Sequence, residues 1–415
     1  MTAQLETPAA ALTTFGEVFA VPEFRALWVA QLLSILGDQL ARVALTLLVY
    51  RQTRSALLAA VTFAASSVPL FVGGLTLSGL ADRFPRRTVM IGCDLSRAGL
   101  VVVMALPGLP LAAQVAPLFL VTLISAPFSA ARAALYPQIL SGDRYVLGTA
   151  VTLTTLQFSQ VAGYAVGGAI AGWFGLRPSL LADAATFLGS ALISWLWVRA
   201  RPAARARTAG RSGAMAGLRL VFGDPALRLP MLLGWLAASY NVSDGVAAPL
   251  GHALGGGDAA AGLILAASAL GASVGAVLFG RLVRPGRRQR LMSPLAAASC
   301  GFQMLLVVRP ALPVALVILT VGGLFGCYQL AASAAFVGGV PAGQRSQAFG
   351  IAQGGLSLGQ GAAMIAAGWA AQHYSPSATI AVSGLLGVVA AVAITLTSSQ
   401  QRAERRLAER GQPLS

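Results

Sequence analysis

Long apolar segments separated by short breaks rich in Arg, Pro or Gly dominate this sequence. Each segment has roughly the 20 residues that an α-helix needs to cross the hydrocarbon core of a bilayer. Only 10% of the residues are charged, against roughly 25% in a soluble domain. The sequence therefore predicts an all-α membrane protein. Twelve such helices with short loops use almost the whole chain, so we expect no second, soluble domain.

The breaks place the twelve predicted spans with soft boundaries. The spans are 26–49, 56–80, 88–106, 112–138, 147–173, 178–198, 227–250, 259–281, 291–308, 311–337, 346–371 and 376–397. The longest break is rich in Arg and Ala and divides the spans into six and six. We expect an N-terminal six-helix bundle over 1–198, a basic cytoplasmic linker over 199–226, a C-terminal bundle over 227–398 and a cytoplasmic tail over 399–415.

The distribution of basic residues predicts the orientation. The net charge is +16, and all 29 basic residues are Arg. They lie between apolar segments rather than on a soluble basic face, so we expect no nucleic-acid partner. Most of them lie in alternate breaks, whereas the breaks of the other side hold only Arg51, Arg54, Arg177 and Arg309. An excess of Arg marks the cytoplasmic side, so we expect both termini in the cytoplasm and a multi-pass protein of the inner or plasma membrane.

The two predicted halves repeat one turn, the turn after their second span. The positions that recur are Gly79, Arg83, Arg86 and Arg87 in the first half and Gly280, Arg284, Arg287 and Arg288 in the second. The acidic Asp82 is replaced by Val283 in the second copy. Two six-helix halves in parallel repeat are typical of carriers that work by alternating access. We therefore expect two pseudo-symmetric bundles.

The pattern Gly79-x-x-Asp82-Arg83-x-x-Arg86-Arg87 resembles the signature loop of the major facilitator superfamily, with Pro85 where the family usually has Gly. Further segments resemble its drug and siderophore exporter branch; they are Phe24–Trp28, Gly37-Asp38, Met90–Ala98 and Ala182–Phe187. In span five, Gly163-x-x-x-Gly167-Gly168 resembles the antiporter motif without the Pro that normally follows. The resemblance implies the superfamily fold and secondary active transport.

The resemblance also implies a gate in which the signature loop latches the halves in the outward-facing state. The residues expected at this cytoplasmic gate are Gly79, Asp82, Arg83, Arg86, Arg87, Asp94, Arg97 and Arg132. A carboxylate in this loop can face a helix N-terminus and nearby guanidinium groups. For the paired Arg residues, a plain cytoplasmic anchor is the alternative.

Ionisable residues at bilayer depth are costly, so they pair or face the interior of the bundle. The spacing of Gln31, Ser34, Asp38, Arg42 and Thr46 places them on one helical face of span one. Asp38 and Arg42, one turn apart, can form an ion pair and are the candidates for proton coupling. The alternative is a permanent pair that only fixes packing. Asp183, near the outer end of span six, is expected to be a packing or capping acid.

Polar side chains in the spans are candidates for lining a solute cavity. The set is Gln31, Gln160, Tyr164, Asn241, Asp244, Gln329 and Gln353. The glycines at four-residue spacing in span five, Gly163, Gly167 and Gly168, predict close helix packing.

Catalytic and metal-binding patterns are missing from the sequence. The three cysteines lie in separate apolar segments, the two histidines are far apart, and there is no P-loop. We expect no enzyme activity, no cofactor and no metal. The leading prediction is proton-coupled efflux of a small amphipathic compound by a monomer in the bilayer. The alternatives are proton-coupled uptake of a nutrient and, less in keeping with the signature loop, a non-transporting membrane sensor or lipid-embedded enzyme.

Overall fold

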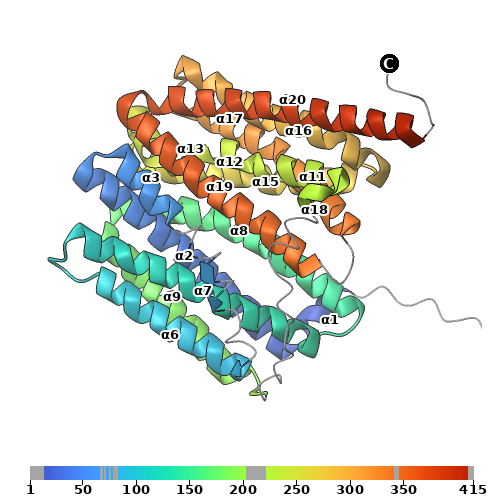
Figure 1. Cartoon of the computed structure of the whole chain (residues 1–415). Helices are drawn as coiled ribbons and strands as arrows, with labels where there is room; N and C mark the ends of the chain where they lie inside the picture. The colour runs from blue at the N-terminus through green and yellow to red at the C-terminus, as the bar shows by residue number, and fades with distance from the viewer. Residues whose placement is uncertain are drawn as a thin grey trace, which may run out of the picture.

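The computed structural model describes residues 14–65, 69, 72, 73, 76, 77, 83–201, 221–340 and 345–409. All regular secondary structure within these residues is helical. Figure 1 shows the helices of the two ends of the chain as two groups, blue to green and yellow to red, lying side by side. The predicted domain boundaries stay predictions. The Arg-rich segment 202–220 lies outside the described residues.

The N-terminal half holds the first group. Its helices are α1 (Phe15–Phe19), α2 (Pro22–Thr53), α3 (Ala56–Ala64), α6 (Arg86–Met104), α7 (Leu111–Ile139), α8 (Asp143–Trp173) and α9 (Leu176–Trp197). Short connections separate α7 from α8 and α8 from α9. Gly142 and Gly175, with φ of 55° and 83°, precede α8 and α9 in conformations that favour glycine.

The C-terminal half holds the second group. Its elements are α11 (Pro225–Trp235), α12 (Ala237–Tyr240), α13 (Val242–Gly245), α14 (Ala247–Ala253), α15 (Gly257–Leu282), α16 (Pro285–Met304), the 3-10 helix η1 (Leu305–Val308), α17 (Leu312–Phe325), α18 (Tyr328–Gly339), α19 (Arg345–His373) and α20 (Pro376–Glu409). The predicted tail is continuous with the last span as far as Glu409.

Each predicted span coincides with helix, although only the first part of span two, Ala56–Ala64, lies in a described helix. Among the described residues, seven helices are long and apolar enough to cross a membrane by length and composition. They are Pro22–Thr53, Leu111–Ile139, Arg177–Trp197, Gly257–Leu282, Gly286–Val308, Leu312–Gly339 and Pro376–Ser398. The count of twelve spans and the cytoplasmic termini stay predictions.

Two spans that the sequence presents as single helices are interrupted. The predicted span 227–250 is divided into α11, α12, α13 and α14, and the predicted span 311–337 is divided between Phe325 and Tyr328. The first interruption includes Asn241 and Gly245, residue types that stabilise a helix poorly. At Gly245 the backbone lies against Met364 of α19, where a Cβ atom would be 2.9 Å from the Met364 Cβ. Close contact with a neighbouring helix thus accompanies the break.

The two halves meet through α8 against α15 and α3 against α19. A Cβ atom on Gly168 would lie 2.5 Å from the Gly262 Cα, so the two backbones nearly touch. Nearby, Arg51 of α2 forms an ion pair with Asp258 of α15. Ser55 donates a hydrogen bond of 2.9 Å to the Gln372 side chain of α19. We call this end of the molecule the closed end.

Candidate functional site

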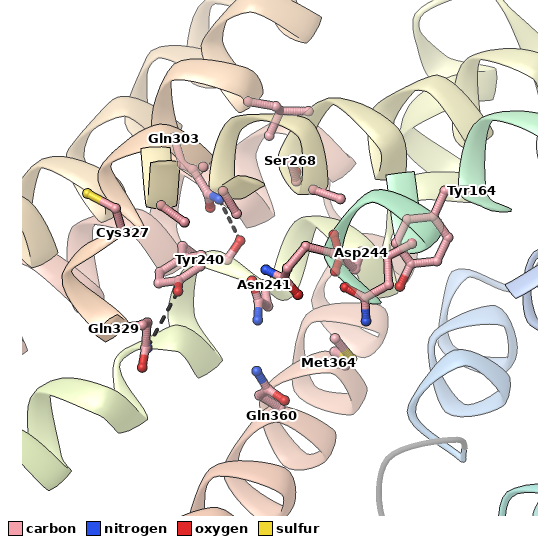
Figure 2. Close-up of a pocket in the computed structure, with 18 of the residues that line it drawn as sticks. Tyr164, Tyr240, Asn241, Asp244, Ser268, Gln303, Cys327, Gln329, Gln360 and Met364 are labelled. Atoms are coloured by element: carbon pink, nitrogen blue, oxygen red, sulfur yellow. Dashed lines mark hydrogen bonds between the residues drawn. The ribbon is translucent and has the colours of Figure 1, made fainter. Parts of the chain in front are cut away.

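A cavity of about 360 Å³ lies between the two halves. We call it the central cavity. Five of the residues that the sequence predicts to line a solute cavity do line this one; they are Gln160, Tyr164, Asn241, Asp244 and Gln329. Arg42 lines it as well. Figure 2 shows Tyr164 of α8 near Asp244 of α13, on opposite halves of the chain. A volume of this size is at the lower end of the range for small-molecule sites.

Four buried polar atoms on the wall of the central cavity have no hydrogen-bond partner among the described residues. They are Arg42 Nε, Asp244 Oδ1, Ser268 Oγ and Gln303 Oε1. Buried polar atoms are normally paired, and an unpaired one costs free energy. These atoms are therefore available to a polar solute or to water. They come from both halves, so one solute can bind to both at once.

The interruption of the predicted span 227–250 forms part of this wall. Since the break leaves carbonyl groups without helical partners, side chains of other helices supply donors. Gln303 Nε2 donates to the Tyr240 carbonyl at 2.5 Å, and Gln329 Nε2 donates to the Gly234 carbonyl at 2.8 Å. Figure 2 shows Gln303 and Gln329 on either side of Tyr240. The amides thus hold the broken helix in place at the cavity.

Two predicted cavity residues lie elsewhere. Gln31 is buried and accepts a hydrogen bond of 3.0 Å from the Tyr136 hydroxyl, away from the central cavity. Gln353 is exposed on α19 and does not line it. Gln360, two helical turns further along α19, lines the cavity instead. Sequence reasoning chose the wrong turn of α19 because nothing local distinguishes the two glutamines.

Next to the central cavity is a second one, of about 280 Å³, within the N-terminal half. We call it the side cavity. Asp38 and Arg132 line it, and Arg42 and Gln160 line both cavities. Both coupling candidates thus face internal space, as expected for polar residues at this depth.

The predicted ion pair between Asp38 and Arg42 does not form. Asp38 Oδ2 instead lies 3.7 Å from Arg97 Nη1 of α6. The Arg42 guanidinium lies over the Phe63 ring, 5.4 Å from its centroid, in a cation–π contact. Spacing along a helix allowed the pair, but α3 and α6 offer each side chain another partner.

Arg97 is the centre of a buried polar cluster. Its guanidinium lies between the rings of Phe128 and Phe187, at 4.6 and 4.3 Å from their centroids. It forms an ion pair with Asp94 and donates a hydrogen bond of 3.1 Å to Ser125. In this structure both side chains belong to this cluster, and their role at the cytoplasmic gate stays a prediction.

The second carboxyl oxygen of Asp94, Oδ2, accepts a hydrogen bond of 2.6 Å from the Ser190 hydroxyl of α9. Arg132, which was predicted at the cytoplasmic gate, forms no ion pair within 4.0 Å with Asp94 or Asp38. Its guanidinium lies 5.8 Å from the centroid of the Phe128 ring and faces the side cavity. The polar cluster thus joins α2, α6 and α9 without Arg132.

The described part of the signature loop stabilises the N-terminal half. Arg86 donates a hydrogen bond of 2.8 Å to the Ala134 carbonyl near the end of α7. Arg87 donates to the Trp195 carbonyl in the last turn of α9. Basic side chains stabilise the unpaired carbonyls at helix ends in this way. Arg83 is exposed, and Gly79 and Asp82 lie outside the described residues, so the latch stays a prediction.

The glycines of span five lie at close approaches of the backbone. A Cβ atom on Gly163 would lie 2.7 Å from the Gln39 Cβ, and one on Gly167 would lie 3.4 Å from the Leu40 Cα. Gly168 instead faces Gly262 of the other half. The motif therefore packs α8 against α2 on one side and against α15 on the other.

Outside the membrane-spanning helices, Arg201 forms an ion pair with Glu23 at the start of α2, with an Nη2–Oε2 distance of 2.8 Å. The Glu23 carboxylate raises the pKa of the Arg201 guanidinium above its ordinary value. In the described part of the chain, no group of three His, Cys, Asp or Glu side chains is arranged to hold a metal ion.

These observations define a class, the two-bundle helical carrier with a central cavity. The chain belongs to the major facilitator superfamily, whose sequence profile matches residues 27–243 and 238–415. It is thus a secondary transporter and a multi-pass protein of the cell membrane, with several apolar helices long enough to span.

Relatives and solved structures support this assignment. The enterobactin exporter EntS of Shigella boydii serotype 4 is 27% identical over 281 residues, which are 65% of this chain and 66% of that protein. EntS of Escherichia coli O1:K1 is 27% identical over 289 residues, 66% and 68% of the two chains. The chain thus resembles the siderophore exporter branch, over about two thirds of the length of these relatives.

Two crystal structures share the fold. A transporter of the POT family in complex with a thioalcohol-conjugated peptide has a TM-score of 0.75 at 10% identity, covering 92% of this chain and 99% of that one. A bacterial homologue of the human lysosomal transporter Spinster, inward-facing and occupied, has a TM-score of 0.72 at 14% identity, covering 91% and 96%.

Proposed function

We propose that this protein exports a small amphipathic compound across the cell membrane in exchange for protons, by alternating access. The observation that carries the proposal is the central cavity, where unpartnered polar atoms of both halves face the same space. A solute bound there touches both halves, so its binding energy can act on their relative position. The packing of α8 on α15 blocks this cavity at the closed end.

The predicted orientation identifies the state of the structure, and the relatives support export. Arg51 and Arg54 lie at the closed end, and they belong to the few Arg residues on the predicted outer side. The proposed state is therefore closed to the outside, with the cavity ready to take a solute from the cytoplasm. The relatives that are named as enterobactin exporters favour the same direction. Uptake of a nutrient is the competing function.

Asp38 supports proton coupling. Its side chain is 27% exposed, toward the side cavity, and it is close to the Arg97 guanidinium. A carboxylate that binds a proton loses its attraction to a nearby guanidinium, so protonation would alter the contact between α2 and α6. Asp38 can thus couple proton binding to the position of a helix that lines the cavity.

Transport by the purified full chain in proteoliposomes tests this function. Vesicles with an imposed pH gradient are loaded with a compound panel that includes enterobactin, and flux is measured in both directions. We expect flux of at least one compound opposite to the proton flow, at least about tenfold lower in Asp38→Asn. Asp143→Asn, at the exposed first turn of α8, is the matched control. Flux in the same direction as protons would favour uptake, and full gradient-driven flux in Asp38→Asn would exclude the role of Asp38.

A further inference from the structure

Asp183 of α9 is a second buried acid beside Asp38. Its side chain is fully buried, and neither carboxyl oxygen has a hydrogen-bond partner among the described residues. The adjacent Thr186 hydroxyl donates to the main-chain carbonyl of Asp183, at 2.7 Å. The carboxyl group lies against Gly37 of α2, in space that any Cβ atom at position 37 would fill. The residue next to Gly37 is Asp38.

The charges around Asp183 come from its two main neighbouring helices. The charge that acts on it from α2 is Asp38, and the charge from α6 is Arg97, which forms an ion pair with Asp94. The third neighbour, α8, has only Asp143 and Arg144 as charged residues, both in its first turn. Arg97 is therefore the one guanidinium in this part of the described structure whose charge acts on all three carboxyl groups.

Arg97 is already committed to the other two carboxyl groups. It forms its ion pair with Asp94 and lies 3.7 Å from Asp38. The remaining Arg residues of this interior, Arg42 and Arg132, face the cavities. Burying an ion without a partner costs several kcal/mol even after relaxation, whereas a neutral carboxylic acid avoids most of this cost. An ionised Asp183 would thus be an unpaired buried charge.

We infer that Asp183 is a proton-binding site, held as a carboxylic acid in this state, and that it exchanges its proton with the side cavity through Asp38. This inference rests on the proposed proton-coupled function and deepens it. When the Asp183 proton passes to the Asp38 carboxylate, Asp38 becomes neutral and Asp183 takes the negative charge. The net charge of the cluster stays constant. Arg97, whose charge reaches both groups, can then stabilise Asp183 in place of Asp38.

Infrared spectroscopy of the full chain in lipid tests the protonation directly, without a solute or a pH gradient. A protonated carboxyl group has a C=O stretch above the amide band, which a carboxylate lacks. We expect a band of this kind at neutral pH that is lost in Asp183→Asn and kept in the control Asp258→Asn, which removes an ion-paired carboxylate. An unchanged band in Asp183→Asn would overturn the inference.

Two further measurements keep the test decisive. If Asp183→Asn does not fold, Asp183→Glu should shift the frequency of the band while keeping it, and an unshifted band would count against Asp183. The route is tested by hydrogen–deuterium exchange of the band, which we expect to slow at least about tenfold in Asp38→Asn. Equal exchange rates would exclude Asp38 as the route. Since neither readout involves transport, a failed flux assay would leave the assignment of Asp183 standing.

Discussion

The Asp258 carboxylate of α15 forms an ion pair with the Arg51 guanidinium of α2 and so joins the two halves at the closed end. The other carboxyl oxygen of Asp258 lies 2.8 Å from His252 Nε2 of α14. The His252 ring in turn lies 5.2 Å from the Tyr50 ring, centroid to centroid. A cluster from both halves thus closes one end of the central cavity. A state open at this end must break the ion pair.

Arg51→Ala should weaken the closed end. The Arg51 side chain is 45% exposed, so the pair contributes at most about 1 kcal/mol, or a roughly fivefold shift in population. The measurement is disulfide formation between cysteines at Ser55 and Gln372, which the native cysteines, all buried, do not disturb. We expect a lower yield in Arg51→Ala and no change in Arg177→Ala, an exposed Arg on the same predicted side. Equal yields in the three proteins would show that the ion pair does not hold the halves together.

Gly168→Ala should prevent the halves from closing. The added Cβ atom would lie 2.5 Å from the Gly262 Cα, and backbone on both sides cannot move aside cheaply. The same disulfide should form at least about tenfold more slowly. Gly172→Ala is the matched control, one turn further along α8, where the nearest atom to a new Cβ would be 3.8 Å away. Similar losses in both variants would point to a general effect on α8 rather than to the contact with α15.

Arg97→Met should destabilise the N-terminal half by about 3–5 kcal/mol, because Asp94 would be left as an unpaired buried charge. The double variant Asp94→Asn with Arg97→Met should recover part of this loss, since the remaining group is neutral. Thermal unfolding in detergent measures both, with Arg83→Met, an exposed Arg, as the control. Absence of recovery in the double variant would mean that the contact of Arg97 with the two aromatic rings matters more than the charge.

Gln329→Leu should destabilise the broken helix by about 1–3 kcal/mol, because the Gly234 carbonyl would lose its donor. Gln353→Leu provides a matched control on α19, since Gln353 is exposed and outside the cavity. Thermal unfolding of the two variants is compared with that of the wild type. Equal stability of the two variants would show that water replaces the amide at Gly234.

The glycine motif of span five shows which features of helix packing the local sequence can predict. Four-residue spacing correctly marked Gly163, Gly167 and Gly168 as positions that face other helices, since the period of a helix is local information. The partners depend on the fold. Gly163 and Gly167 pack against α2, whereas Gly168 faces Gly262, a residue of the other half.

The central cavity shows the same limit. Polar residues were singled out within apolar spans because the bilayer excludes them from its lipid side, and Gln160, Tyr164, Asn241, Asp244 and Gln329 line the central cavity. Gln303 and Gln360 were missed, although the same signal applies to them. Gln31 instead bonds to Tyr136 of the neighbouring α7, and Gln353 is exposed on α19 outside the cavity.

The sequence by itself determined that this chain is a bundle of membrane helices in two related halves, because span length, apolar character and the signature loop are properties of short segments. Only the tertiary structure decided which charges pair. Asp38 lies close to Arg97 instead of Arg42, Arg51 binds Asp258 of the other half, and the Asp183 carboxyl group has no hydrogen-bond partner among the described residues. Each of these contacts depends on helices far apart in the chain, and the energy of a buried charge depends on all the helices around it.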